Sequence, residues 1–330
     1  MRQVREPDGT DFEAAARVIA RHLSPTPMLE SRGLGERVHL KVETLQPTGS
    51  FKVRGALAAV ARIVATDPST KIIAGSAGNH GLGVAFASQL LGADATIVIP
   101  RSASGAKRRA LARFDAEVLS RGDSYDEAEA YAIELAAGAG RFVSPYNDPD
   151  VIAGQGTIAR EVLGQTPAVG SIVVPVGGGG LISGIALGAS LHAHERAIRV
   201  YGVEAEASPA LSSCVAAGHT VSVEIGSTLA DGLAGNVEPG SVTVGLAARY
   251  TAGIVRVTEA AIREAVCYLA LEHGLVVEPS GAVGVAAMMS GALDLGNDSG
   301  QEPGDTVLVV SGRNVEGELF AGILRDAMMP

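Results

Sequence analysis

The sequence has 330 residues, a formal net charge of −10 at pH 7 and 47% hydrophobic residues. A chain of this length can bury a large core and hold one large or two medium domains. The acidic charge argues against nucleic acids and anionic membranes as partners, because both repel a negative protein. Two cysteines without metal-ligand spacing and an N-terminus without an apolar signal core predict a cytoplasmic protein.

The first informative segment is residues 41–56, KVETLQPTGSFKVRGA. Pro47 and Gly49 predict a turn, and the run that follows has the apolar spacing of a helix packed on a core. Lys52 stands at the junction, where a lysine can lose its hydration shell and serve as a neutral amine. The segment fits a lysine that bonds covalently to a carbonyl group, and it also fits a solvated lysine at a helix start.

A second segment, SAGNHGLGVA over residues 76–85, follows the predicted strand KIIAG. Amide groups at the start of a helix bind anions, and glycines let a ligand approach the backbone closely. The segment therefore predicts an anion-binding loop. A tight turn with close helix packing would give the same pattern.

Short β-branched runs alternate with longer helical runs along the rest of the chain. The predicted strands are residues 71–76, 95–100, 116–122, 141–146, 171–176, 199–204, 253–257 and 306–312. The predicted helices are residues 78–92, 105–114, 124–138, 147–164, 181–194 and 259–274. This alternation predicts an α/β fold of parallel sheets with helices on both faces. The turn-rich joint at residues 146–149 suggests a domain boundary near residue 147.

Residues 162–194 contain no formally charged side chain and so resemble a membrane span. Pro175 and the glycines at 177–180 interrupt the middle of the stretch. We therefore expect a buried strand, a loop and a buried helix instead of one long apolar helix.

The loop inside that stretch is PVGGGGLISG, residues 175–184. Four successive glycines between a strand and a helix present backbone N–H groups suited to a phosphate. The competing interpretation is a dinucleotide site. Gly178, Gly180 and Ser183 come close to the GxGxxG spacing, and Glu204 ends the next strand at roughly the required ~20-residue distance.

A last segment, VVSGRNVEG over residues 309–317, ends a predicted strand at Ser311. Ligands of open α/β sheets sit at the carboxyl ends of the strands. Ser311 is therefore a candidate ligand contact, although a serine that caps the following turn would look the same.

These segments, in this order, resemble the pyridoxal-phosphate enzymes of fold type II, in particular the branch of serine/threonine dehydratases and serine racemases. The resemblance covers nearly the whole chain. It implies two open, twisted, mostly parallel sheets with helices on both faces, as in the tryptophan synthase β-like fold. It also implies a large cofactor-binding domain at residues 1–70 and 149–330, and a small substrate-carboxylate-binding domain at residues 71–148.

The resemblance assigns roles residue by residue, with pyridoxal 5′-phosphate as cofactor. Lys52 is the catalytic residue and the covalent attachment point. The resemblance implies that the cofactor contacts Lys52, Asn79, Gly177, Gly178, Gly179, Gly180 and Ser311. It implies that the substrate contacts Ser76, Ala77, Gly78, Asn79 and His80. No metal site is expected, because the acidic partner of Glu204 in the related racemases is replaced by Ala210.

The reaction implied is β-elimination from an L-β-hydroxy amino acid, L-threonine or L-serine, giving a 2-oxo acid and ammonia. Racemases of this branch typically place a second serine after the one at position 76, and Ala77 cannot carry a proton there. Serine racemisation and β-replacement on the same fold remain alternatives, as does a nicotinamide-dependent oxidoreductase built on the glycine loop. The expected partner is a small amino acid, and the expected assembly is a homodimer or homotetramer.

Overall fold

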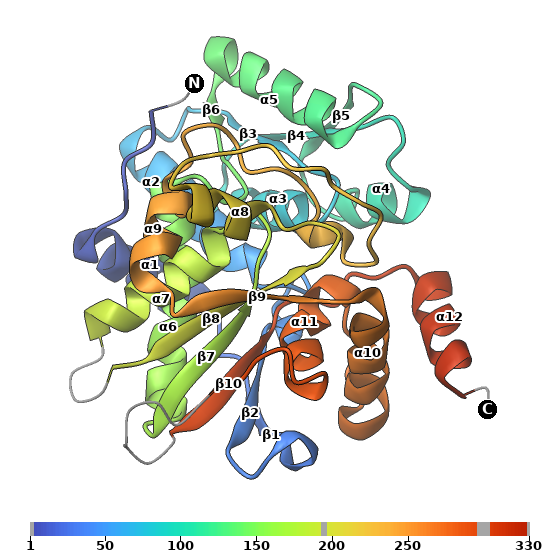
Figure 1. Cartoon of the computed structure of the whole chain (residues 1–330). Helices are drawn as coiled ribbons and strands as arrows, with labels where there is room; N and C mark the ends of the chain where they lie inside the picture. Colours follow the sequence, from blue (N-terminus) through green and yellow to red (C-terminus); the bar gives the residue numbers. More distant parts are fainter. Residues whose placement is uncertain (1–2, 193–196, 296–303, 329–330) are drawn as a thin grey trace. The chain divides into compact units, whose positions relative to one another are not determined.

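The computed structural model describes residues 3–192, 197–295 and 304–328 (Figure 1). The chain forms two compact units. The larger unit comprises Met1–Glu6, Pro25–Leu45 and Gly156–Pro330. The smaller unit comprises Pro7–Ser24 and Gln46–Gln155.

The larger unit is built on a six-stranded sheet. Its strands are β1 (Met28–Glu30), β2 (Val38–Val42), β7 (Val169–Pro175), β8 (Arg199–Ala205), β9 (Gly253–Val257) and β10 (Asp305–Val310). Their order is β1-β2-β10-β7-β8-β9, and only the β1–β2 pair is antiparallel. Every residue of β7 is buried, which is typical of a parallel strand covered on both faces.

Helices cover both faces of this sheet. They are α7 (Gly180–His192), α8 (Ala210–Ala217), α9 (Val242–Tyr250), α10 (Glu259–His273), α11 (Pro279–Met289), α12 (Gly317–Met328) and the end of α6 (Pro149–Gln165). Figure 1 shows α10 and α11 on one side of the strands and α7 on the other. Within the uncharged stretch, residues 162–165 end α6, and strand β7, a loop and helix α7 follow as predicted; residues 193 and 194 lie outside the described residues. Within the described residues no helix is both long and apolar enough to span a bilayer.

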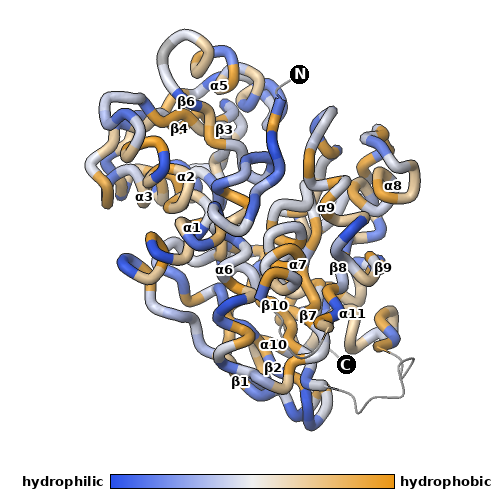
Figure 2. The backbone as a smooth tube through the Cα atoms, turned by 90° about the vertical axis from the view of Figure 1, so that its left-hand side faces the viewer, coloured by the Kyte–Doolittle hydropathy of each residue, from blue (hydrophilic) through white to orange (hydrophobic). Residues whose placement is uncertain are grey.

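The smaller unit holds a four-stranded parallel sheet. Its strands are β3 (Ile72–Gly75), β4 (Ala95–Ile99), β5 (Glu117–Ser120) and β6 (Arg141–Phe142), in the order β5-β4-β3-β6. Its helices are α1 (Gly9–His22), α2 (Lys52–Thr66), α3 (Asn79–Leu91), α4 (Gly105–Leu111), α5 (Tyr125–Ala139) and the first part of α6. Figure 2 shows hydrophobic residues along the strands of this sheet, as expected for a buried layer.

The predicted fold class, α/β with two mostly parallel sheets, is confirmed. The two units, however, divide the chain differently from the expected domains, because α1 and α2 fall in the smaller unit with residues 71–148. The reason is packing: Val53, Leu57 and Val60 of α2 share one hydrophobic core with Ile72 and Ile97 of the sheet. Helix α6 also runs through the unit boundary, which lies beyond the joint near residue 147. The function expected for residues 71–148 stays a prediction.

Candidate active site

Lys52 is the first residue of α2, directly after a turn in the smaller unit. Gly49 adopts a φ of +77° and its N–H donates to the Gln46 carbonyl at 2.8 Å, which closes the turn. Lys52 is half-buried, and its Nζ donates to the Pro145 carbonyl at 2.8 Å. The lysine is therefore held by the protein, and the interpretation of a freely solvated side chain is set aside.

Helix α3 lies directly against the start of α2. A Cβ on Gly83 would come within 3.2 Å of the Lys52 carbonyl carbon and oxygen, so the glycine permits this close approach. A Cβ on Gly81 would come within 2.0 Å of the Ser76 carbonyl oxygen, so the preceding loop also requires a glycine. These two glycines pack the predicted substrate loop and the predicted catalytic lysine into one small region.

The start of α3 has the features of an anion site. The first helical hydrogen bond runs from the Leu82 N–H to the Gly78 carbonyl, so the three preceding amides have no helical acceptor. The Ser76 hydroxyl accepts from the Gly78 N–H at 3.2 Å, which orders the loop. A Cβ on Gly78 would have only the Ser76 Oγ, at 4.0 Å, as a neighbour within 4 Å. The space beside Gly78 is thus open to a ligand.

His80 is a neutral hydrogen-bond donor inside this region. Its side chain is 3% exposed, and Nε2 lies 2.8 Å from the Val143 carbonyl. A carbonyl only accepts, so the proton is on Nε2 and Nδ1 carries a lone pair. Nδ1 is buried and has no hydrogen-bond partner among the described residues. Burial, together with the nearby positive charge of Lys52, lowers the pKa of His80 to about 3.

This buried neutral ring should make folding sensitive to acid. The folded-state pKa of about 3 lies below the ordinary 6.5, so the unfolded chain binds a proton first as the pH falls. Stability present above pH 6.5 is therefore lost between pH 6.5 and about 3. From pH 7 to pH 5 we expect His80 to account for ~2 kcal/mol of lost unfolding free energy.

Urea unfolding at both pH values, on wild type and His80→Gln, measures this contribution. The variant should lose ~2 kcal/mol less than wild type between pH 7 and pH 5. His22→Gln, which removes an exposed histidine of α1, is the matched control and should behave as wild type. Equal acid sensitivity in wild type and His80→Gln would show that His80 does not stay neutral in the fold.

The glycine loop of the larger unit forms a second anion cradle, between β7 and α7. The Thr243 hydroxyl donates to the Gly178 carbonyl at 2.9 Å and anchors the loop. Gly179 has a φ of +89°, and a Cβ there would lie 2.9 Å from the Thr243 Cβ. The first helical hydrogen bond runs from Ser183 to Gly179. The amides of residues 180–182 therefore remain available to an anion such as a phosphate.

Ser311 follows β10, next to the strand that leads into the glycine loop. Strands β10 and β7 are parallel neighbours, so Ser311 and the loop leave the sheet at the same edge. Ser311 is buried. The Gly312 carbonyl after it accepts from the Glu278 N–H at 3.0 Å, which ties this strand end to the start of α11. The larger unit thus places a hydroxyl and an anion cradle at neighbouring strand ends.

Glu204 has a structural task in the larger unit. Its Oε1 accepts from the amides of Leu211 at 2.8 Å and Ser212 at 3.2 Å, so the carboxylate caps the start of α8. Burial raises the pKa of this side chain. The described residues hold no group of three or more His, Cys, Asp or Glu side chains suited to a metal ion. This capping role accounts for an acidic residue at position 204, so a bound ribose is not needed to explain it.

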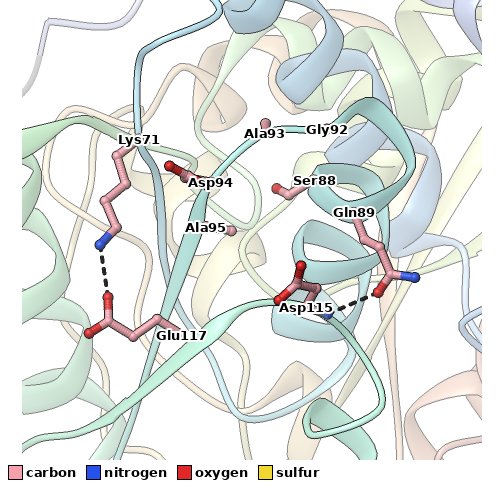
Figure 3. Close-up of a pocket in the computed structure, with 9 residues that line it drawn as sticks. All are labelled: Lys71, Ser88, Gln89, Gly92, Ala93, Asp94, Ala95, Asp115 and Glu117. Carbon is pink, nitrogen blue, oxygen red and sulfur yellow. Dashed lines mark hydrogen bonds and ion pairs between the residues drawn. The ribbon is translucent and has the colours of Figure 1, made fainter.

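A pocket of about 330 Å³ in the smaller unit lies at the amino ends of the strands of its sheet (Figure 3). It is lined by Lys71, Asp94 and Glu117, which stand at or next to the amino ends of β3, β4 and β5. Lys71 pairs with Glu117 at 2.8 Å, and this hydrogen bond lowers the pKa of Glu117. The loop at Ser76 follows the carboxyl end of β3, where ligands of such sheets bind. The pocket therefore lies away from the strand end that leads into the Ser76 loop.

Each predicted site residue thus falls into one of two groups. The smaller unit brings together Lys52, Ser76, Ala77, Gly78, Asn79 and His80. The larger unit brings together Gly177, Gly178, Gly179, Gly180 and Ser311. The sequence did not reveal the carbonyls of Val143 and Pro145 or the anchor Thr243. Backbone carbonyls carry no residue-type signal, so no pattern could have identified the first two.

Comparison with known proteins gives consistent matches. Residues 19–312 match the family model described as pyridoxal-phosphate dependent enzyme. The chain is 37% identical over 324 residues to L-threonine ammonia-lyase of Thermotoga maritima, covering 97% of this chain and 78% of that protein. A threonine deaminase from T.th. superposes with a TM-score of 0.80 at 36% identity, covering 94% of this chain and 99% of that chain. Maize serine racemase superposes with a TM-score of 0.85 at 29% identity, covering 98% of each chain.

Proposed function

The chain belongs to the family of pyridoxal-phosphate-dependent enzymes, and we propose that it converts L-threonine or L-serine to the corresponding 2-oxo acid and ammonia. The family match makes pyridoxal 5′-phosphate its cofactor and sets aside the nicotinamide-dependent alternative. The observation that carries the proposal is Lys52, whose amine is held at 2.8 Å by a neutral carbonyl beside an anion-binding loop. Relatives named threonine ammonia-lyase and threonine deaminase support this choice of substrate.

The residues present fit the cofactor. We propose that Lys52 bonds to its aldehyde, that Gly177–Gly180 hold its phosphate, that Asn79 contacts its ring oxygen and that Ser311 faces its ring nitrogen. The observation behind the phosphate assignment is the loop itself, where a Cβ on Gly179 would strike Thr243 and the first-turn amides of α7 lack helical acceptors. When bound, pyridoxal phosphate supplies an electron sink for the substrate's Cα.

The protein's own residues would then perform three tasks. The hydroxyl of Ser76 and the amides at the start of α3 bind the substrate carboxylate. Lys52 removes the proton from Cα and, as an ammonium, can return a proton to the departing β-hydroxyl, which leaves as water. Water then hydrolyses the resulting enamine to the 2-oxo acid and ammonia. Ala77 places a methyl group where the related racemases have a second serine, so no proton reaches the other face of Cα from this position. Elimination is therefore favoured over inversion.

A substrate profile tests the function. The purified enzyme should release a 2-oxo acid and ammonia in equal amounts from L-threonine or L-serine, without a second substrate. Product formation only when a thiol or another nucleophile is added would identify a β-replacement synthase instead. Release of neither product from a panel of L-β-hydroxy amino acids would overturn the proposal.

Substitution of Gly179 by alanine should weaken cofactor binding. The left-handed φ of +89° costs an L-residue ~1–2 kcal/mol, and the new methyl would lie 2.9 Å from the Thr243 Cβ. We expect the affinity for pyridoxal phosphate to fall about tenfold or more, measured by titration of the cofactor-stripped enzyme. Gly164→Ala is the matched control, because a Cβ there meets nothing within 4 Å. Unchanged affinity in a folded Gly179→Ala variant would remove this loop from the phosphate site.

We also propose that the enzyme works in the cytoplasm as a homodimer or homotetramer. Both cysteines are free and buried, which suits a reducing compartment. Light scattering on the holoenzyme should give two or four times the 33.5 kDa chain mass. A mass equal to one chain at assay concentration would refute the assembly without affecting the reaction.

A further inference from the structure

Two side chains of the candidate site in the smaller unit form hydrogen bonds to one short backbone segment. The Lys52 Nζ donates to the Pro145 carbonyl, and the His80 Nε2 donates to the Val143 carbonyl, both at 2.8 Å. These carbonyls are two residues apart, in the segment that follows strand β6. This carbonyl segment comprises Val143–Asn147.

The carbonyl segment is fixed at both ends. The Val143 N–H donates to the Ile73 carbonyl of β3 at 2.9 Å, which continues the parallel pairing of β6. The Ser144 hydroxyl accepts from the Asn147 N–H at 3.1 Å and closes a turn around Pro145. Proline adds a fixed φ and has no N–H of its own. These contacts restrict the segment, and the His80 hydrogen bond to the Val143 carbonyl adds a further contact two residues before Pro145.

His80 acts as a donor and not as an acid. The only ring proton is on Nε2, where it is donated in a hydrogen bond to the Val143 carbonyl, so the ring has no second proton to transfer. The neutral ring also adds no positive charge beside Lys52. The ring therefore joins α3, which begins at the substrate loop, to the carbonyl segment. The same segment accepts the hydrogen bond of the Lys52 amine.

We propose that His80 is a positioning residue for Lys52: it fixes the carbonyl segment so that Pro145 holds the lysine amine whenever the amine is not bonded to the cofactor. This inference rests on the proposed function. A carbonyl has no proton, so it accepts an N–H from the neutral amine and leaves the nitrogen lone pair free. When the lone pair takes the Cα proton, the resulting ammonium keeps its hydrogen bond to Pro145, which stabilises the charge.

The test uses two variants with opposite expectations. His80→Phe keeps a buried ring and removes the donor, whereas His80→Gln keeps an N–H at a similar reach. A misplacement of about 1 Å costs roughly 10²-fold in rate, so we expect a drop of that order in kcat for His80→Phe and a small change in KM. His80→Gln should recover most of the loss. Ser88→Ala, a buried site on the same helix whose hydroxyl has no partner among the described residues, is the control.

A second measurement does not depend on turnover. Pyridoxal phosphate is added to the cofactor-stripped enzyme, the covalent bond to Lys52 is trapped with borohydride at set times, and peptide mapping locates the label. His80→Phe should slow the capture by Lys52 about as much as it slows kcat, and His80→Gln should restore it. This readout holds even if threonine and serine prove not to be substrates, so the two hypotheses fail separately.

The proposal is overturned by either of two results. One is wild-type capture and kcat in a folded His80→Phe. The other is equal slowing in His80→Phe and His80→Gln, which would indicate a packing role alone. If His80→Phe does not fold, Pro145→Gly tests the same segment, since it keeps the carbonyl and frees the backbone. Wild-type capture by Pro145→Gly would then refute the positioning role.

Discussion

Replacing Lys52 with alanine should remove both the visible absorption of the holoenzyme and its turnover. In the proposed mechanism the variant lacks both the amine that bonds to the cofactor and the base that removes the Cα proton. A general base alone contributes ~10²–10⁴-fold, and loss of the covalent attachment adds to that. We therefore expect turnover to fall by at least about 10³-fold.

The structure explains why Lys52 and not another lysine is expected to react. The chain has four lysines. The Lys41 Nζ is fully buried and pairs with Glu161 at 2.7 Å, and the Lys71 Nζ pairs with Glu117 at 2.8 Å. A carboxylate partner stabilises the ammonium form and hides the lone pair. The Lys52 Nζ instead donates to the Pro145 carbonyl at 2.8 Å, beside the predicted substrate loop.

Borohydride reduction of the holoenzyme followed by peptide mapping decides the attachment point. The label should appear on the peptide that contains Lys52. Lys107→Ala is the matched control, because it removes a lysine from α4 of the same unit and should keep both absorption and turnover. A label on any other lysine, or normal absorption in Lys52→Ala, would refute the assignment.

Much of the local structure of the candidate site could be predicted from sequence, because turns, glycine clusters and strand ends have residue-type signatures. Gly49 takes the positive φ that its turn predicted, and Gly179 does so in the tetraglycine loop. The segment PTGSFK placed Lys52 at the start of a helix, as the structure has it. These features depend on a few neighbouring residues, so a pattern can capture them.

Contacts between distant segments could not be predicted. The Pro145 carbonyl lies 93 residues from Lys52 along the chain, and any residue could supply a carbonyl. The placement of α2 with the smaller sheet depends on how Val53 and Leu57 pack against strands that come later in the sequence. Glu204 had the spacing of a ribose-binding acid, yet its Oε1 caps α8. In each case the partner, and not the residue type, decides the role.

Replacing Ala77 with serine should let the enzyme form a detectable D-amino acid. Wild type should release a 2-oxo acid and ammonia with little or no D-product, because in the proposed site the face of Cα opposite Lys52 lacks a proton carrier. Ala77 is half-buried in the loop before α3, packed beside the core of the smaller unit. A hydroxyl at this position would supply the missing proton, and such groups contribute ~10²–10⁴-fold.

The polar neighbours of Ala77 are not expected to supply that proton in the wild type. In the proposed site the Ser76 hydroxyl donates its O–H to the substrate carboxylate, and neutral His80 donates its Nε2–H to the Val143 carbonyl, so neither proton is directed at that face of Cα. Chiral chromatography of L-serine reactions should therefore show D-serine with Ala77→Ser and none with Ala77→Gly, which removes the methyl without adding a hydroxyl. Substantial D-serine from the unmodified enzyme would mean that a water or another residue protonates that face. Ala77 would then not be what separates elimination from racemisation in this protein.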